Sequence, residues 1–336
     1  MKRIFVTGTA GFIGFHLAQL LLEDGFRVHG FDGLTDYYDV KLKLDRQKQL
    51  VSHENFSFTN AMLEDDSQLQ DAIDAFEPHM IVHLAGQAGV RHSLEQPRQY
   101  IASNVMGTMN IMEGARRHKV EHLLMASSSS VYGANTHMPF RETDQVDTQL
   151  TIYAASKKAN ESMGHAYAHL WNIPTTMFRF FTVYGAWGRP DLAYFKFTDA
   201  ILKGEPINIH NHGQMARDFT YVTDLVRGIR LIMDAVPPLP GAQPAVEGDS
   251  LSPAGPYRVV NIGNSDKVSL LDFIEAIEDG LGITAKRNLL PMQPGEVVET
   301  WADCSLLQRL TGYKPQTDLK DGMKTFIRWY RDYYGK

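Results

Sequence analysis

A glycine-rich turn near the start of the chain constrains the fold more than any other feature. The β-rich run Ile4 to Thr7 is followed directly by Gly8-Thr-Ala-Gly11-Phe-Ile-Gly14, and Phe15 to Glu23 carries helix-forming residues. A strand, a glycine turn and a helix in this order form the context of a dinucleotide-binding fingerprint, although the spacing is G-x-x-G-x-x-G. Small residues let the backbone approach a pyrophosphate, and the helix N-terminus offers unpaired N–H groups and a positive dipole end. The alternative interpretation is that the three glycines are ordinary turn residues.

An acidic residue ends the second predicted strand. Arg27 to Phe31 has the composition of a strand, and Asp32 follows it. A carboxylate at this place accepts hydrogen bonds from both hydroxyls of an adenosine ribose and repels a 2′-phosphate. The sequence therefore predicts NAD rather than NADP as the cofactor.

Strands and helices alternate over the first half of the chain. Further strands are expected at 56–58, 80–84, 122–126 and 175–180, and helices at 67–76, 100–117 and 151–171. This rhythm predicts an α/β fold with a Rossmann-type doubly wound parallel sheet, in which ligands bind at the carboxyl ends of the strands.

The alternation loosens in the second half. We expect helices at 194–203, 270–281 and 321–334, short strands at 207–210 and 217–222, and a proline-rich surface excursion at 235–256. We therefore predict a NAD-binding domain at 1–180, to which a segment at about 215–235 returns. A smaller C-terminal α/β domain at 181–336 would mainly bind the substrate.

A tyrosine and a lysine are spaced for one face of the helix expected at 151–171. Tyr153 and Lys157 are four residues apart, and positions i and i+4 lie one above the other. A lysine ammonium beside a phenol favours the phenolate, so we expect a lowered pKa for Tyr153. The hydroxyls of Ser127 to Ser130 follow an apolar run and would complete a proton relay to a sugar hydroxyl. Tyr-x-x-x-Lys alone also occurs by chance in many helices.

Composition excludes several classes of function. The 33 basic and 39 acidic residues give a net charge of −6, so no electrostatic feature favours nucleic acid or an anionic membrane. Cys304 is the only cysteine, which excludes an internal disulfide and suits a reducing cytoplasm. No run of about 18 apolar residues and no signal-peptide pattern is present, so we expect a soluble cytoplasmic protein. The thirteen histidines form no H-x-x-x-H pattern, and no metal site is predicted.

The motifs together resemble the extended short-chain dehydrogenase/reductases, in the group of nucleotide-sugar epimerases and dehydratases. They are the glycine turn, Asp32, His83-Leu-Ala-Gly86, Asn104, Ser127-Ser128 before Val131-Tyr132-Gly133, Tyr153-x-x-x-Lys157 and Arg217-Asp-Phe219. Proteins similar to this keep NAD bound, oxidise a sugar carbon and return the hydride later. The resemblance implies Tyr153, Lys157 and Ser128 as catalytic residues. It implies a cofactor site formed by Gly8, Gly11, Phe12, Ile13, Gly14, Asp32, Leu63, Leu84, Ala85, Gly86, Asn104, Tyr153 and Lys157.

Details of the motifs favour one branch of this family. The 4,6-dehydratases carry an Asp-Glu pair after the relay residue, and the uronate decarboxylases carry a glutamate before Val-Tyr-Gly. This chain has Ser129 and Ser130 at those positions. Thr182 stands where galactose-type 4-epimerases have asparagine, and Arg189 follows in a loop that they lack. A hydroxyl and a guanidinium suit a C6 carboxylate. The chain therefore resembles NAD-dependent UDP-glucuronate 4-epimerases, which are isomerases that form UDP-galacturonate through a 4-keto intermediate. The implied substrate-binding residues are Ser128, Ser129, Thr182, Arg189, Arg217 and Arg91.

Several alternatives stay open at this point. The chain would otherwise be a UDP-glucuronate decarboxylase, another epimerase or dehydratase of the group, or a non-catalytic NAD-sensing protein. Arg189 and Arg91 would otherwise support their loops, and Arg217 would be a surface charge. Galactose-type enzymes carry a diphosphate-binding arginine where this chain has Pro291 to Gly295, so another group must replace it. The resemblance also implies a homodimer, paired through a four-helix bundle of the helices at 100–117 and 151–171.

Overall fold

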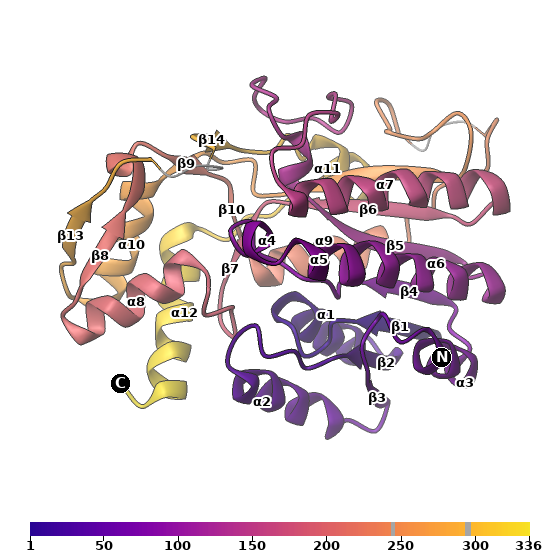
Figure 1. Cartoon of the computed structure of the whole chain (residues 1–336), viewed down its shortest axis with the longest axis horizontal. Coiled ribbons are helices and arrows are strands. Elements are labelled where there is room, and N and C mark those ends of the chain that lie inside the picture. The colour runs from indigo at the N-terminus through magenta and orange to yellow at the C-terminus, as the bar shows by residue number, and fades with distance from the viewer. Residues whose placement is uncertain (243–245, 293–296) are drawn as a thin grey trace.

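The computed structural model describes residues 1–242, 246–292 and 297–336. It contains a larger α/β part around a parallel sheet and a smaller part, which lies to the left in Figure 1 and includes β8, β13, α8, α10 and α12. The C-terminus lies in the smaller part and the N-terminus in the larger one.

Seven parallel strands form the main sheet, in the order β11-β6-β5-β4-β1-β2-β3. Their bounds are β1 Arg3–Thr7, β2 Arg27–Asp32, β3 Phe56–Asn60, β4 Met80–His83, β5 His122–Ser128, β6 Thr175–Phe180 and β11 Tyr257–Ile262. The predicted doubly wound sheet is confirmed. The order reverses between β1 and β4, the place where ligands bind in open sheets of this kind.

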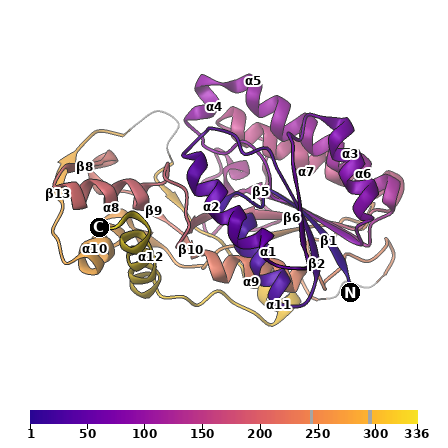
Figure 2. The same ribbon diagram turned by 90° about the horizontal axis from the view of Figure 1, so that it is seen from below.

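Helices cover both faces of this sheet (Figure 2). On one face lie α1 Phe12–Glu23, α9 Val222–Ile232 and α11 Ser305–Thr311, and on the other α3 Asp66–Phe76, α6 Gly107–His118 and α7 Ile152–Trp171. The alternation of side chains along each strand explains the two layers. Ile4 and Val6 of β1 join the core under α1 and α9, whereas Phe5 joins the core under α3 and α6. Because helices cover both faces, every residue of β4, β5, β6 and β11 is buried.

The segment from 92 to 118 is less regular than predicted. The short helices α4 His92–Glu95 and α5 Pro97–Tyr100 lead into a π-helical turn, η1 Ile101–Met106, before α6 begins.

The helix α2, which spans Val40–Val51, buries the polar residues Lys43, Arg46 and Gln47. Two 3-10 turns, η2 Ser129–Tyr132 and η3 His210–Gly213, complete the short elements.

The smaller part has an apolar core of its own. The helices α8 Ala193–Lys203, α10 Leu270–Leu281 and α12 Leu319–Tyr334 pack around residues such as Tyr194, Phe273 and Phe326, which are almost fully buried. The remaining strands are short: β7 Thr182–Tyr184, β8 Pro206–Ile209, β9 Ala216–Arg217, β10 Phe219–Tyr221, β12 Val268–Ser269, β13 Lys286–Leu289 and β14 Glu299–Thr300. Of these, β8 and β13 pair with each other in the smaller part. In the described part of the chain, no helix is both long and apolar enough to cross a membrane.

Two expectations about the second half were wrong. The single strand predicted at 217–222 is divided into β9 and β10, because the buried Asp218 carboxylate accepts hydrogen bonds from backbone N–H groups, among them those of Asn264 and Ser265. The seventh strand of the main sheet, β11, was not predicted at all, and it follows directly on the predicted excursion at 235–256.

Candidate active site

A cavity of about 1000 Å³ lies at the carboxyl ends of the central strands, between the larger and the smaller part of the molecule. Most of the residues that the sequence suggested line it: Gly8, Gly11, Phe12, Ile13, Gly14, Asp32, Leu63, Leu84, Ala85, Gly86, Arg91, Ser128, Ser129, Tyr153, Thr182, Arg189 and Arg217. Asn104 and Lys157 are buried directly behind the wall. A Cβ on Gly86 would lie 2.9 Å from Asn104 Oδ1 and 3.5 Å from Lys157 Nζ.

The glycine turn forms a cradle that side chains cannot enter. Gly8 has a φ of +80°, and a Cβ on Gly14 would lie 2.0 Å from the Gly8 carbonyl oxygen. The helix α1 begins at Phe12, within this motif, and its N-cap, Gly11, has no capping side chain. The first N–H groups of α1 therefore face the cavity, as a pyrophosphate requires. These features fit a dinucleotide, since an exposed backbone and a helix N-terminus are its binding elements.

Asp32 is held in place at the far end of this cradle. Its carboxylate accepts hydrogen bonds from the backbone N–H groups of Ala10 (3.0 Å) and Leu34 (2.9 Å). Burial raises the pKa of Asp32, and these hydrogen bonds and the nearby Lys43 ammonium oppose the rise. The fixed carboxylate at the end of β2 is placed to bind the hydroxyls of an adenosine ribose.

Tyr153 and Lys157 lie in the first two turns of α7. The helix begins after Thr151, whose hydroxyl accepts a hydrogen bond from the Ala154 N–H, and this cap fixes Tyr153 at the cavity wall. Lys157 Nζ donates to the Ala126 carbonyl at 3.0 Å, and burial lowers the pKa of this lysine to about 8.

The expected lowering of the Tyr153 pKa by Lys157 was wrong for the protein alone. Burial raises the pKa of Tyr153, and it is the Ser128 hydroxyl and the positive charge of Arg189 that oppose this rise. Loss of water around a phenolate outweighs the neighbouring charges, because burial always disfavours the ionised form.

Ser128 ends β5 beside Tyr153. Its hydroxyl donates to Ser130 Oγ at 3.1 Å and accepts from the Ser130 N–H at 3.2 Å, so the turn η2 holds the side chain at the wall. Ser129 and Ser130 line the same cavity. Neither position 129 nor position 130 carries a carboxylate side chain.

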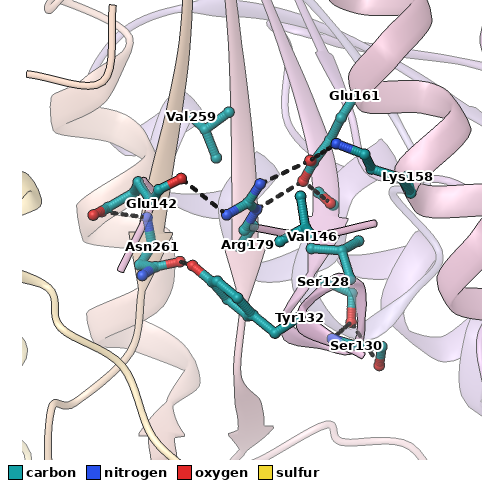
Figure 3. A network of polar contacts seen from close by, with 12 residues as sticks. Ser128, Ser130, Tyr132, Glu142, Val146, Lys158, Glu161, Arg179, Val259 and Asn261 are labelled. Atoms are coloured by element: carbon teal, nitrogen blue, oxygen red, sulfur yellow. Dashed lines mark hydrogen bonds and ion pairs between the residues drawn. The ribbon is translucent and has the colours of Figure 1, made fainter. Parts of the chain in front are cut away.

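A buried polar network supports the serine run from behind (Figure 3). Arg179 of β6 forms two hydrogen bonds of 2.9 Å with the Glu161 carboxylate, and Ser127 donates to the same carboxylate at 2.6 Å. The Arg179 guanidinium also lies over the Tyr132 ring, 4.8 Å from its centre. Burial raises the pKa of Glu142, at the edge of this network, to about 7. The network fixes the backbone on both sides of Ser128.

Thr182 and Arg189 line the same cavity. The Thr182 N–H donates to the Asp218 carbonyl at 3.1 Å, where β7 runs parallel to β10. Arg189 forms hydrogen bonds with both carboxylate oxygens of Asp191, at 2.9 and 2.5 Å, and Tyr37 donates to Asp191 at 3.2 Å. Arg189 thus has a partner within its loop, and its charge still acts on Tyr153 across the cavity.

Two further arginines line the cavity. Arg217 donates to the carbonyl oxygens of Val297 (2.5 Å) and Val298 (2.9 Å), which fix its guanidinium at the wall. Arg91 precedes α4 and is exposed. The segment Pro291 to Gly295, where another group was expected to replace an arginine, lies partly outside the described residues. Asn104 does not reach the cavity, because its side chain bonds the backbone N–H and carbonyl of Gln87.

Sequence reasoning missed three residues on the loop and helix that follow β2. Tyr37 and Lys43 line the cavity, and Lys43 donates to the Thr35 carbonyl and hydroxyl. Arg46 is fully buried. The signal was present in the sequence, because Lys43 and Arg46 share a helix face with the apolar Leu50, at spacings of three and four residues. Among the residues that the structure describes, no group of three or more potential metal ligands occurs.

Comparison with known proteins agrees with this geometry. Residues 4–242 match the model of the NAD dependent epimerase/dehydratase family. The chain is 49% identical over 334 residues to a Rhizobium meliloti protein named "Probable UDP-glucuronate 4-epimerase", covering 99% of this chain and 98% of the relative. It is 42% identical to UDP-glucuronate 4-epimerase 2 of Arabidopsis thaliana, covering 98% of this chain and 76% of the relative. A crystal structure of UDP-glucuronic acid 4-epimerase from Bacillus cereus, in complex with UDP-glucuronic acid and NAD, superposes with a TM-score of 0.88 at 30% identity, covering 99% and 100% of the two chains.

Proposed function

We propose that this chain, which belongs to the NAD dependent epimerase/dehydratase family, is an isomerase that interconverts UDP-glucuronate and UDP-galacturonate. The observation that carries this conclusion is that Arg189 and Thr182 line the same cavity as Tyr153 and Ser128, with the Arg189 charge acting on Tyr153. Tyr153 and Ser128 offer an acid–base group for a sugar hydroxyl. Arg189 and Thr182 offer a guanidinium and a hydroxyl for a carboxylate on the same ring.

NAD fits the cradle formed by Gly8, Gly11 and Gly14, with its adenosine ribose on Asp32. When bound, it supplies the hydride acceptor and donor for C4 of the sugar. Lys157 is placed to bind the nicotinamide ribose through the gap at Gly86, where a side chain would block the approach. The cofactor site that we propose also includes Phe12, Ile13, Leu63, Leu84 and Ala85, and Asn104 would support it from behind through its bonds to the Gln87 backbone.

The residues of the chain move the proton. Tyr153 Oη, as phenolate, takes the proton of the 4-hydroxyl, and Ser128 Oγ hydrogen-bonds the 4-oxygen. The Arg189 charge favours the phenolate, which burial alone would disfavour. The ring then turns about its link to the diphosphate and presents the other face of C4, after which Tyr153 returns the proton.

The carboxylate needs a holder for a chemical reason. The 4-keto intermediate is a β-keto acid. Such an acid loses carbon dioxide when its C5–C6 bond lies parallel to the π orbitals of the C4 ketone. Arg189, backed by Asp191, and Thr182 would hold the carboxylate in an orientation that disfavours this cleavage. A guanidinium suits this task because its planar fork fixes a carboxylate in two directions.

Other residues bind the remainder of the substrate. Arg217 and Arg91 line the cavity and would contact the diphosphate, while Ser129 would contact the sugar. Residues 1–180, with the returning segment at about 215–235, would hold the cofactor, and residues 181–336 would mainly hold the UDP-sugar. Cys304 is the single cysteine of the chain and is buried, which suits a reducing cytoplasm.

A decarboxylase and a NAD-sensing protein are less well supported. A decarboxylase or dehydratase of the group would use a carboxylate at the position of Ser129 or Ser130, and both line the cavity as serines. A sensor has no use for an intact acid–base pair, whereas Tyr153 and Lys157 are both present at the cofactor cradle.

The proposal is tested by incubating the purified protein with UDP-glucuronate and no added metal, then resolving the products by chromatography and mass. We expect a new peak of unchanged mass that co-elutes with UDP-galacturonate. A Tyr153→Phe variant should retain bound NAD and lose activity by about a hundredfold or more, because it lacks the proton-transfer group. Products that are all lighter by carbon dioxide, or a fully active Tyr153→Phe variant, would reject the proposal.

A further inference from the structure

The loop that carries Arg189 is held by side chains of the NAD-binding part. The carbonyl of Ala186 accepts a hydrogen bond from His16 Nε2 at 2.9 Å. The carbonyl of Trp187 accepts from Arg46 Nη2 (2.6 Å) and Nε (3.1 Å), and that of Gly188 accepts from Arg46 Nη2 at 3.0 Å. Three successive carbonyls are therefore bonded to helices α1 and α2, immediately before Arg189.

Arg46 is an unusual residue for its position. It is completely buried, yet the oxygens that accept its hydrogen bonds are uncharged: three carbonyls and the Tyr38 hydroxyl. A buried guanidinium is costly, and its full set of directed hydrogen bonds makes it tolerable. Such a group fixes the relative positions of its acceptors, because its donors form a rigid fork.

The remaining acceptor belongs to the glycine turn. Arg46 Nη1 donates to the Ala10 carbonyl at 2.8 Å, and the Ala10 N–H donates to Asp32. One side chain thus joins the backbone of the glycine turn to the backbone of the loop before Arg189, a sequence separation of more than a hundred residues.

Packing around Trp187 reinforces this arrangement. Trp187 has a φ of +57°, a left-handed conformation that a bulky residue rarely adopts. Its ring lies against Phe15 of α1, 5.6 Å between centres, and against Trp329 and Tyr333 of α12. The strained backbone is stable only because the neighbouring contacts fix it.

We propose that Arg46 is a positioning residue that sets the location of Arg189 and so decides whether the substrate keeps its carboxylate. This inference rests on the proposed function. Loss of the fork would let the 186–188 loop move, and Arg189 would then hold the carboxylate loosely. In the 4-keto intermediate the C5–C6 bond would break, its electron pair would pass into the ketone as an enolate that takes a proton, and carbon dioxide would leave.

The test uses Arg46→Lys, which keeps the charge and loses the fork, with Arg258→Lys as the matched control. Arg258 is equally buried and is bonded to Asp249 and the Ala235 carbonyl, away from the cavity lining. Two ratios are measured for each protein. One is the amount of carbon-dioxide-depleted product relative to UDP-galacturonate, and the other is the affinity for UDP-glucuronate relative to UDP-glucose in a calorimeter.

We expect Arg46→Lys to raise the first ratio and lower the second, each by about tenfold, with Arg258→Lys leaving both unchanged. Wild-type ratios in Arg46→Lys would overturn the inference, even if the variant is less stable. If Arg46→Lys does not fold, His16→Leu is used instead, because it removes the bond to Ala186. It must raise the first ratio and lower the second, as expected for Arg46→Lys. A wild-type protein without turnover would reject the proposed function, whereas the affinity ratio would still decide the role of Arg46.

Discussion

Single residues of the site show how burial and charge compete. Burial raises the pKa of Tyr153 and lowers that of Lys157 to about 8, so both side chains favour their uncharged forms more than they would in water. The Arg189 charge and the Ser128 hydroxyl act against burial at Tyr153. Under the proposed function Arg189 would serve the site twice, as the group for the carboxylate and as a charge that favours the phenolate.

Glu142 gives a pH-dependent prediction. Burial raises its pKa from the ordinary 4.5 to about 7, so the folded protein binds its proton more tightly than the unfolded chain does. Below pH about 4.5 this carboxyl does not lower the free energy of unfolding, because it is protonated in both the folded and the unfolded state. The free energy of unfolding falls as pH rises and has lost the full contribution above pH about 7. Glu142→Gln, which retains an acceptor for the Asn261 N–H, should become more stable than the wild type as pH rises from 4.5 to 7. We expect a gain of roughly 1–3 kcal/mol in denaturant unfolding.

A matched control is Glu247→Gln, which changes a carboxylate in the surface excursion. Its stability relative to the wild type should not change over this pH range. A constant difference between Glu142→Gln and the wild type at all pH values would show that the Glu142 pKa is ordinary.

The local motifs could be predicted from the sequence because each rests on neighbouring residues. The glycine turn, Asp32 and Ser128 lie at the carboxyl ends of β1, β2 and β5, and Tyr153 lies in the first turn of α7, all at the same cavity. The pKa of Tyr153 could not be predicted in this way, since it depends on burial by residues far away in the chain. Arg46 was missed for the same reason, because its partners at 187 and 188 are distant in sequence.

Helices and strands position these residues, and the clearest case is the turn between β1 and α1. Gly14 lies in α1 with its Cα directed at the Gly8 carbonyl oxygen, so that a Cβ would come within 2.0 Å. That contact involves two backbone segments and cannot be relieved by a side-chain rotation. The glycine is thus required for the close approach of helix to turn.

A pair of glycine-to-alanine variants tests the importance of this turn. Gly14→Ala should displace α1 from the turn, and the purified protein should carry less than about a tenth of the wild-type NAD. Gly228→Ala is the control, since Gly228 lies in α9, where a Cβ would meet side chains at 3.5 Å or more. It should retain NAD and be about 0.5–1 kcal/mol more stable, as expected for alanine in a helix. Normal NAD content in Gly14→Ala would contradict the assigned cradle.

The elements of the second half were harder to predict, because their interactions are long-range. Residues 217–222 have the composition of one strand, but Asp218 turns inward to bond backbone N–H groups near residues 264 and 302, and the strand is interrupted. β11 pairs with β6 across about eighty residues of sequence, and its apolar run carries no local sign of that pairing. Short elements of this kind are fixed by tertiary contacts rather than by their own composition.

In the molecule as a whole, the site lies between two parts with separate cores, and the Arg46 guanidinium and an aromatic cluster are among the contacts between them. Trp187 contacts α12, Tyr333 donates to Asp45 of α2 at 2.5 Å, and Arg46 bonds the intervening loop. These contacts hold the proposed cofactor site and the proposed carboxylate site in a fixed relative position. This arrangement suits a reaction in which one ring must react on both of its faces without leaving the cavity.

The homodimer is a proposal that belongs to the whole molecule. The helices α6 and α7 lie side by side in Figure 1, and the turn η1, which leads into α6, also packs against α7. Together η1 and α7 expose Ile101, Met106, Ile152, Leu170 and Trp171. We propose that a second copy of the chain covers this face as a four-helix bundle. Light scattering should give twice the mass of the chain, and Met106→Glu should shift the protein to a monomer. Leu44→Glu, at a similarly exposed helix position on α2, is the control and should remain dimeric.

The most direct measurement uses UDP-glucuronate that carries deuterium at C4. Oxidation and re-reduction at C4 within one closed site, with the carboxylate held throughout, predict UDP-galacturonate of unchanged mass that retains the deuterium at C4. A product that has exchanged this deuterium with solvent would contradict return of the same hydride. A product that has lost carbon dioxide would contradict the role of Thr182 and Arg189 as holders of the carboxylate.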